Sequence, residues 1–323
     1  MHHGQVPRPI ARGLSILRDR IAAAHIPSSK IDETLLVATW NVRELGKHPR
    51  LDASLHYLAE VIGMFDLVCL VEVRDDVHDL AKILQYLGPY WRVVFSEYVM
   101  DAGGNRERVA FVYDSRAAVF TGLASHVIGT RKKVGDEFVD TVSFWRPPYL
   151  ASFRAGNFDF VVLGTHVRWG ASIKSRAREL GKLADWIASE QSGRFVFDKD
   201  LIVVGDFNIP STKSPLYAAV TSKGLKAPTG ILDPGSDLAE RATYDQILVS
   251  PKFPDSVTGK GGVVDVWSGS YRPLYAGISK KSNAQLTWEM SDHLPLWIEL
   301  NTDDDRWKAD QVLARRAAID ATR

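Results

Sequence analysis

The chain has 323 residues and a mass of 35.9 kDa, with 45% hydrophobic and 24% charged residues, as in a globular protein with a large core. This composition excludes a disordered chain and a collagen, and a single cysteine, Cys69, excludes a disulfide scaffold. The 40 Lys and Arg residues nearly balance 39 Asp and Glu residues, so any polyanion site has to be a local patch. No membrane span or secretory signal is visible, so we expect a cytoplasmic protein with no membrane partner.

Hydrophobic periodicity predicts a helix over residues 9–25, followed by an irregular alternation of strands and helices. The predicted strands cover residues 34–41, 66–72, 91–98, 108–113, 117–122, 148–154, 158–166, 201–206, 244–250, 263–267 and 294–300. The helices between them cover residues 54–64, 77–87 and 174–189.

Several of these strands follow one another without a helix between them, which excludes an all-parallel sheet. Two mixed β-sheets packed face to face, with helices outside, fit this order and place the chain in the α/β class. No linker is strong enough to divide the chain. We therefore expect one domain over residues 31–301, an N-terminal helical extension over residues 1–30 and a charged C-terminal helical tail over residues 302–323.

Apolar strands of this chain end in polar residues that a hydrophobic core would exclude. These endings are Asn41, Glu72, His166 and Asp206-Phe207-Asn208, while Ser291-Asp292-His293 precedes the last strand. Each residue alone has an ordinary explanation, such as a salt-bridged strand end, a satisfied core histidine or a turn former. These four endings and the segment before the last strand together predict one site at a sheet rim, because a rigid sheet fixes the side chains that it presents there.

The residue types in this set suit the hydrolysis of a phosphate ester. Glu72 and Asp292 supply hard oxygen ligands, and no Cys/His cluster has zinc spacing, so Mg²⁺ or Mn²⁺ is the expected cation. His166 and His293 can transfer protons near neutral pH. A divalent cation, an amide donor and two imidazoles supply an activated water, charge stabilisation and a proton for the leaving oxygen.

Five short motifs resemble, in order, those of the endonuclease/exonuclease/phosphatase superfamily. They are Thr39-Trp40-Asn41, Val71-Glu72-Val73-Arg74, Gly205-Asp206-Phe207-Asn208, Tyr244-Asp245-Gln246-Ile247 and Ser291-Asp292-His293. Within the superfamily the chain looks most similar to the pancreatic-type deoxyribonuclease branch, which has an Arg at the position of Arg43. Glu107-Arg108 and Arg146-Pro147-Pro148 also match this branch.

The resemblance implies a four-layer α/β sandwich, in which two central mixed β-sheets are flanked by helices, and a DNA endonuclease activity. It implies metal binding by Glu72, Asp292 and Asn41, and catalysis by His166, His293, Asp206, Asn208, Asp245 and Glu107. His293, oriented by Asp245, would be the general base, and His166, oriented by Glu107, the general acid. Arg146 would hold a phosphate, Arg43 and Arg74 would contact the minor groove of DNA, and Trp169 is expected to stack on a base at the same rim.

Two alternatives stay open at this stage. The same chemistry can act on a phosphoinositide, a sphingolipid or a nucleotide, because one fold hosts many substrates; the near-neutral charge favours this alternative, whereas Arg43 and Arg74 oppose it. A catalytically silent binding module is the second alternative, and the complete set of acidic residues and histidines argues against it. Oligomeric state, endo- or exonucleolytic action and the number of cations are left open by the sequence.

Overall fold

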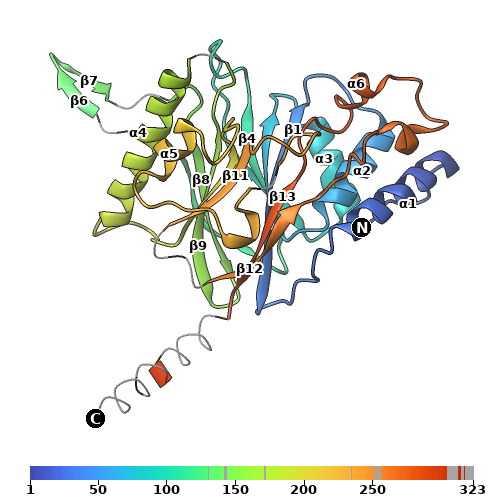
Figure 1. Cartoon of the computed structure of the whole chain (residues 1–323), viewed down its shortest axis with the longest axis horizontal. Helices are drawn as coiled ribbons and strands as arrows, with labels where there is room; N and C mark the ends of the chain where they lie inside the picture. The colour runs from blue at the N-terminus through green and yellow to red at the C-terminus, as the bar shows by residue number, and fades with distance from the viewer. Residues whose placement is uncertain are drawn as a thin grey trace.

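Two β-sheets packed face to face form the centre of the molecule, with helices on both outer faces (Figure 1). The computed structural model describes residues 1–303, apart from 130, 142–143, 171, 234, 251–252 and 254–255, together with residues 312, 313 and 316. The first sheet has the order β12-β13-β1-β2-β4-β3, and the second has the order β11-β10-β9-β8-β5. The mixed two-sheet architecture predicted for the chain is thereby confirmed.

The strands of the first sheet are β1 (Thr34–Leu45), β2 (Leu67–Val73), β3 (Trp91–Phe95), β4 (Arg108–Asp114), β12 (Val257–Val263) and β13 (Leu296–Asn301). Those of the second are β5 (Val119–His126), β8 (Tyr149–Ala155), β9 (Phe158–His166), β10 (Leu201–Asp206) and β11 (Asp245–Val249). Each sheet has one parallel pair in its middle, β1 with β2 and β9 with β10, and antiparallel neighbours elsewhere.

Three apolar clusters hold the layers together. One lies between the sheets, where Phe111, Phe153 and Ile298 are fully buried. A second lies under α1 (Arg8–Ala23), α2 (Asp52–Ile62) and α3 (His78–Leu87), and a third under α4 (Ile173–Ser192) and α5 (Pro215–Thr221). The order is therefore helices, sheet, sheet, helices, because each sheet buries one apolar face against the other and its second face against helices.

The N-terminal helix packs on the body of the molecule. Leu14 and Leu17 of α1 lie in the same cluster as the first sheet, and their spacing of three residues places them on one helix face. Short helical turns, η1 (Thr229–Ile231), η3 (Arg272–Tyr275) and α6 (Asn283–Leu286), occupy the long loops. None of the helices that the structure describes has the length and apolar character needed to cross a bilayer. The domain boundaries stay a prediction.

The predicted strand over residues 263–267 is wrong, because the strand at this place is β12, which ends at Val263. β12 contains Gly259, Gly261 and Gly262 and lies at the sheet edge, so it lacks the apolar alternation by which strands are predicted. The hairpin of β6 (Arg131–Val134) and β7 (Glu137–Asp140) was also not predicted, because all of its residues are exposed. The predicted tail helix lies mostly outside the described residues.

Candidate active site

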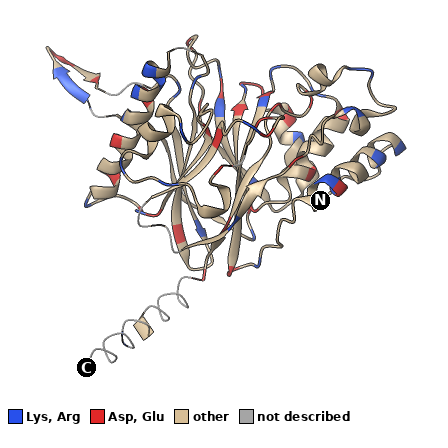
Figure 2. Cartoon of the chain, in the orientation of Figure 1, with Lys and Arg blue, Asp and Glu red and all other residues tan. Residues whose placement is uncertain are grey.

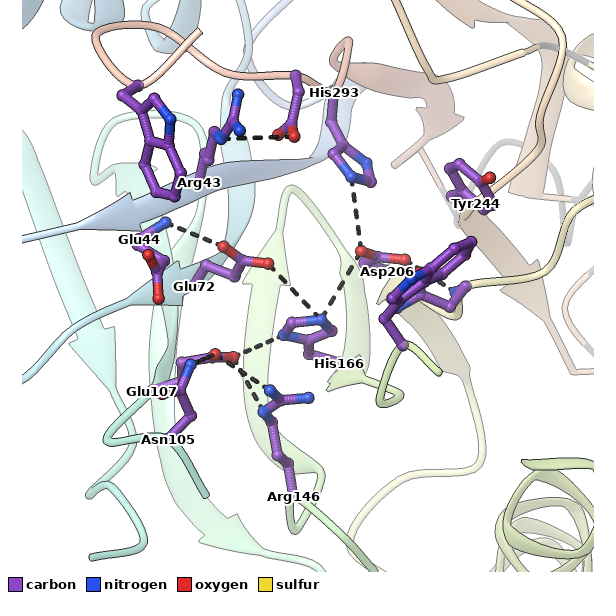
Figure 3. A pocket seen from close by; sticks show the side chains of 14 residues that line it. Arg43, Glu44, Glu72, Asn105, Glu107, Arg146, His166, Asp206, Tyr244 and His293 are labelled. Carbon is purple, nitrogen blue, oxygen red and sulfur yellow. Dashed lines mark hydrogen bonds and ion pairs between the residues drawn. The ribbon is translucent and has the colours of Figure 1, made fainter. Parts of the chain in front are cut away.

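The ends of the two parallel strand pairs meet at one rim of the sandwich, around a cavity of about 490 Å³ that we call the rim cavity (Figure 3). The predicted site residues that line it are Arg43, Glu72, Glu107, Arg146, His166, Trp169, Asp206, Asn208, Asp292 and His293. Asn41 and Asp245 are buried in its wall and hydrogen bond to lining residues. Only Arg74 of the predicted set lies away from it.

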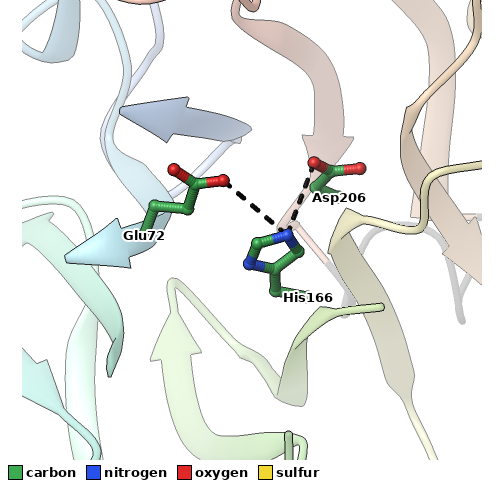
Figure 4. Close-up of side chains that lie close together, drawn as sticks. All are labelled: Glu72, His166 and Asp206. Atoms are coloured by element: carbon green, nitrogen blue, oxygen red, sulfur yellow. Dashed lines mark ion pairs between the residues drawn. The ribbon is translucent and has the colours of Figure 1, made fainter. Parts of the chain in front are cut away.

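His166 is held by a buried carboxylate behind it. Its Nδ1 lies 2.7 Å from Oε2 of Glu107, and Arg146 pairs with the same carboxylate. Burial alone would raise the pKa of Glu107, but the hydrogen bond from His166 and these neighbouring charges lower it to about 2. An ionised carboxylate only accepts, so Nδ1 of His166 donates and Nε2 faces the cavity. There Nε2 lies 3.8 Å from both Glu72 and Asp206 (Figure 4).

His293 repeats this arrangement from the opposite side. Its Nδ1 lies 2.7 Å from Oδ2 of Asp245, and its Nε2 lies 3.8 Å from Oδ2 of Asp206. Burial lowers the pKa of His293, but the charges of Asp245 and Asp206 outweigh this effect and raise it to about 10. For His166, burial likewise lowers the pKa, and Glu107 raises it by more. The Nε2 atoms of both imidazoles thus face one carboxylate oxygen of Asp206.

Asn41 joins the two carboxylates in the centre of the site. Its Nδ2 donates to Oε1 of Glu72 at 2.9 Å and to Oδ2 of Asp206 at 3.0 Å. Glu72 also accepts from the backbone N–H of Glu44 at 3.0 Å. Burial raises the pKa of Glu72 and of Asp206, because each carboxylate is removed from water and lies beside further negative charge. The desolvation of these carboxylates costs free energy, and a perturbed pKa of this kind is typical of functional sites.

The backbone is strained at several residues whose side chains line the cavity. Arg43, Glu44, Glu72 and Asn208 have φ of 46°, 53°, 62° and 52°, in the left-handed region. Non-glycine residues there cost roughly 1–3 kcal/mol each and persist where the surrounding structure enforces them. At Glu72 this coincides with irregular pairing of β2, so the side chain turns into the cavity instead of following the strand alternation.

Gly205 is required by close packing beside Asp206. Its φ is 132°, and a Cβ at this position would lie 1.9 Å from the carbonyl oxygen of Thr165 on the neighbouring strand. After Asp206, the backbone N–H of Asn208 donates to Oδ1 of Asp206 at 2.8 Å, and the buried Arg176 of α4 donates to the carbonyl of Asn208 at 3.0 Å. The loop after β10 is therefore fixed from both sides.

An arginine side chain and aromatic rings lie at the mouth of the cavity. The guanidinium of Arg43 lies 4.0 Å from the ring centre of Trp288, and its Nε lies 3.4 Å from Oδ2 of Asp292. Across the mouth, Trp169 is 65% exposed and contacts Tyr244 edge to face. Arg74 does not reach this mouth: it is buried and donates to Oε1 of Glu44 at 2.6 Å.

The donor set fits a hard divalent cation. Two groups of ligand atoms lie within 4.8 Å of one another, namely Glu72 with His166 and Asp206, and Asp206 with Asp245 and His293. Oδ1 of Asp245 is buried and, within the described part of the chain, has no hydrogen-bond partner. Each group combines two carboxylates with one imidazole nitrogen, a donor set that can hold a divalent cation. Asp292 belongs to neither group, since its carboxylate lies beside Arg43.

A mixed two-sheet sandwich with carboxylate–imidazole pairs at one rim is the architecture of a class of hydrolases. Residues 38–293 match the model of the Endonuclease/Exonuclease/phosphatase family. The chain belongs to this family and is a phosphoesterase of its superfamily. A search of the curated proteins finds no match.

Solved structures share the fold at low sequence identity. The catalytic domain of human nocturnin with bound sulfate is 17% identical, with a TM-score of 0.51, and the match covers 84% of this chain and 96% of that one. Truncated TDP2 of Caenorhabditis elegans is 16% identical, with a TM-score of 0.54 and coverage of 83% and 97%. The mannosyl-6-phosphatase Bt3783 of Bacteroides thetaiotaomicron VPI-5482 is 18% identical, with a TM-score of 0.50 and coverage of 82% and 99%.

Four lining residues were not among the predicted site residues. They are Glu44, Asn105, Tyr244 and Trp288. Tyr244 directly precedes the predicted Asp245, and its place in that motif was a usable signal. Trp288 lies in a loop without a sequence motif, and only the fold brings it to the cavity.

Proposed function

We propose that this protein is a divalent-cation-dependent phosphodiesterase that cleaves DNA. The observation that carries the proposal is the pair of imidazoles, each oriented by a buried carboxylate and each with Nε2 3.8 Å from Oδ2 of Asp206. Two proton-transfer groups on either side of one point suit a displacement in which one oxygen attacks and another leaves.

In this proposal one imidazole accepts a proton from the attacking water, and the other donates a proton to the leaving oxygen. His293, with Nδ1–H held by Asp245, removes a proton from the attacking water through Nε2. This role requires the neutral imidazole, and positive charge bound beside Asp206 would lower the pKa that the two carboxylates raise. His166, with Nδ1–H held by Glu107, gives its Nε2 proton to the leaving oxygen. Asp206 and Asn208 position the water and the scissile phosphate between them. Arg146 binds a phosphate oxygen, for which its buried Nη1 is suited because it has no hydrogen-bond partner among the described residues.

Glu72, Asn41 and Asp292 are the cation ligands that the family resemblance implies. Of the two carboxylates, Glu72 belongs to a group of closely spaced ligand atoms, with His166 and Asp206, and Asp292 does not. When bound, Mg²⁺ or Mn²⁺ supplies positive charge that acidifies water and stabilises the charge of the transition state. Glu72 already lies beside Asn41, whereas Asp292 lies near Arg43 at the mouth.

The mouth of the rim cavity supports a nucleic acid substrate. Trp169 and Trp288 are 65% and 45% exposed, and exposed aromatic rings stack on bases of any sequence. Arg43 stacks on Trp288, lines the cavity beside it and is placed to contact a backbone phosphate. Arg74 is not part of this proposed surface, because it is buried against Glu44. A cytoplasmic location is retained as a proposal.

Plasmid nicking tests the proposal most directly. The protein with Mg²⁺ should relax supercoiled DNA, and chelator or His293→Ala should abolish nicking, with a loss of about 10³-fold in rate. A parallel panel should contain single-stranded DNA, bis(p-nitrophenyl) phosphate, a sugar phosphate, a phosphoinositide and sphingomyelin. Hydrolysis of one of the last three, with every DNA form left intact, contradicts the DNA assignment.

Thermal unfolding tests the cation site independently of the substrate. Mg²⁺ at about 100 times its Kd should stabilise the fold by about 2.7 kcal/mol. Glu72→Gln keeps the shape of the side chain but removes its charge, so it should abolish most of this shift. An equal shift in both proteins would show that Glu72 is not a ligand.

A further inference from the structure

A second, smaller cavity of about 220 Å³ lies beside the rim cavity, between α4 and the segment before β8. We call it the anion pocket, and its lining includes Trp145, Arg168, Ser175, Arg178, Glu179 and Lys182. Ser175, Arg178, Glu179 and Lys182 follow the three-and-four spacing of one helix face, so α4 presents them together. Figure 2 shows Lys and Arg residues on this helix.

The cations of the anion pocket outnumber its carboxylates, since Arg168, Arg178 and Lys182 share the lining with Glu179. In the part of the chain that the structure describes, neither Arg178 nor Lys182 forms an ion pair, although Lys182 is half-buried. Arg168 stacks at 4.1 Å on the ring of Trp145 and donates to the hydroxyl of Ser175. Its Nε is buried and has no partner among the described residues.

The one acidic residue of the pocket is already engaged. Glu179 accepts from the backbone N–H of Trp145 at 2.9 Å, so its carboxylate holds the segment before β8. Three cations and one carboxylate leave a net charge of about +2 around a small cavity, which favours the binding of an anion. Guanidinium and ammonium groups in this arrangement suit the tetrahedral oxygens of a phosphate.

Neighbouring residues of the same two segments line the two cavities. Arg146 lines the rim cavity and its neighbour Trp145 lines the anion pocket. In the same way His166 lines the rim cavity, and Arg168 lines the anion pocket. Two residues of extended chain span at most about 7 Å, so the parts of the backbone that line the two cavities are close neighbours.

From this geometry we infer that the anion pocket is a subsite for a second phosphate of the same nucleic acid strand, next to the phosphate that is cleaved. The inference rests on the proposed function and names its substrate class: a chain of at least two phosphates and not an isolated phosphate ester. Recognition through phosphates is independent of base sequence and depends on salt.

The test compares an oligonucleotide with bis(p-nitrophenyl) phosphate, which has no second phosphate. In the double variant R178E/K182E, the ratio of kcat/KM for the oligonucleotide to that for the small diester should fall at least tenfold. The slope of log KM against log salt for the oligonucleotide should decrease by about 1, as expected when one phosphate contact is lost. The uncharged pair R178Q/K182Q, a milder change in the same helix, should show the same trend with a smaller amplitude.

The matched control is R8E/R12E, which makes the same change of charge at two exposed residues four positions apart on α1. It should leave the ratio and the salt slope unchanged. An unchanged ratio in R178E/K182E, or an equal fall in R8E/R12E, would overturn the subsite.

Failure of the proposed function is recognised separately. If the wild-type protein hydrolyses neither substrate, the phosphodiesterase assignment fails. The anisotropy of a labelled oligonucleotide, measured in chelator, then still decides whether Arg178 and Lys182 bind a strand: equal Kd for R178E/K182E and R8E/R12E excludes it. Inorganic phosphate is added as a competitor to distinguish a site for one phosphate from a longer contact with the strand. If phosphate displaces the oligonucleotide and the Kd does not depend on strand length, the inference is also contradicted.

Discussion

Two cavities of nearly equal volume lie at opposite ends of the first sheet. The rim cavity measures about 490 Å³, and the second, which we call the distal cavity, about 500 Å³. β2 connects them, since Glu72 near its end lines the rim cavity and Asp66 just before its start lines the distal cavity. Both residues are carboxylates whose pKa is raised by burial.

Their hydrogen bonds distinguish them. Asp66 accepts from the hydroxyl of Ser29 at 2.9 Å and from the backbone N–H of Leu36 at 2.7 Å, and the nearby Asp114 is paired with Arg116. In the rim cavity one amide of Asn41 is shared by two carboxylates, and Oδ1 of Asp245 has no partner among the described residues. Polar groups that the protein leaves incompletely satisfied therefore distinguish the site better than volume does.

Asp206→Asn should give the largest functional difference between the two cavities. We expect the phosphodiesterase rate to fall about 10³-fold, because the oxygen that both imidazoles face loses its charge. The melting temperature should stay equal or rise, since a buried and poorly compensated carboxylate has been removed. The matched variant Asp114→Asn should keep the wild-type rate; a similar loss of rate there would remove the functional distinction between the cavities.

Asp66→Ala should have the opposite profile. The buried N–H of Leu36 loses its acceptor, so the free energy of unfolding should fall by about 1–3 kcal/mol while the rate per folded molecule is unchanged. Urea denaturation measures the first quantity. Asp66→Asn keeps a carbonyl acceptor and should cost less; equal losses in the two variants would argue against the hydrogen bond as the cause.

Glu60→Gln should give the smallest effect, and one that depends on pH. Burial raises the pKa of Glu60, but hydrogen bonds from His3 and Arg18 outweigh it and lower the pKa to about 2. A carboxyl group with a lowered folded-state pKa stabilises the fold above its ordinary pKa near 4.5, and this contribution is lost as the pH falls toward 2.

The expected loss for Glu60→Gln at pH 7 is only about 1 kcal/mol, because Arg18 is largely exposed and the pair is screened by solvent. Unfolding curves of both proteins between pH 7 and pH 2.5 should converge as the pH falls. A constant difference over this range would show that the charge of Glu60 contributes nothing. The pair of Arg18 and Glu60 joins α1 to α2 and does not line the rim cavity, so activity should not change.

The sequence was sufficient for the parts of the fold that follow local rules. Buried strands such as residues 158–166 and 201–206 end in polar residues, and parallel pairing of neighbouring strands brings those ends together. For this reason His166 and Asp206 could be predicted to lie at one site. β12 was missed because its glycines carry no side-chain pattern.

Arg74 shows why side-chain directions are harder to predict than strand ends. Strand alternation would place it on the same side as Glu72, two residues earlier. The left-handed φ of 62° at Glu72 breaks the alternation, and Arg74 instead pairs with Glu44. The contacts of Trp288 with Arg43 were equally inaccessible, because they depend on loops that are distant in sequence and meet only in the folded chain.

The last strand of the first sheet has a consequence for synthesis. β13 inserts between β12 and β1, and His293 directly precedes it, while the carbonyl of His293 accepts from the indole N–H of Trp40 at 2.9 Å. A growing polypeptide on the ribosome cannot close this sheet or position its second imidazole until nearly three hundred residues have emerged. Until then the rim cavity lacks His293, so a nascent chain that already contains His166 still has an incomplete site.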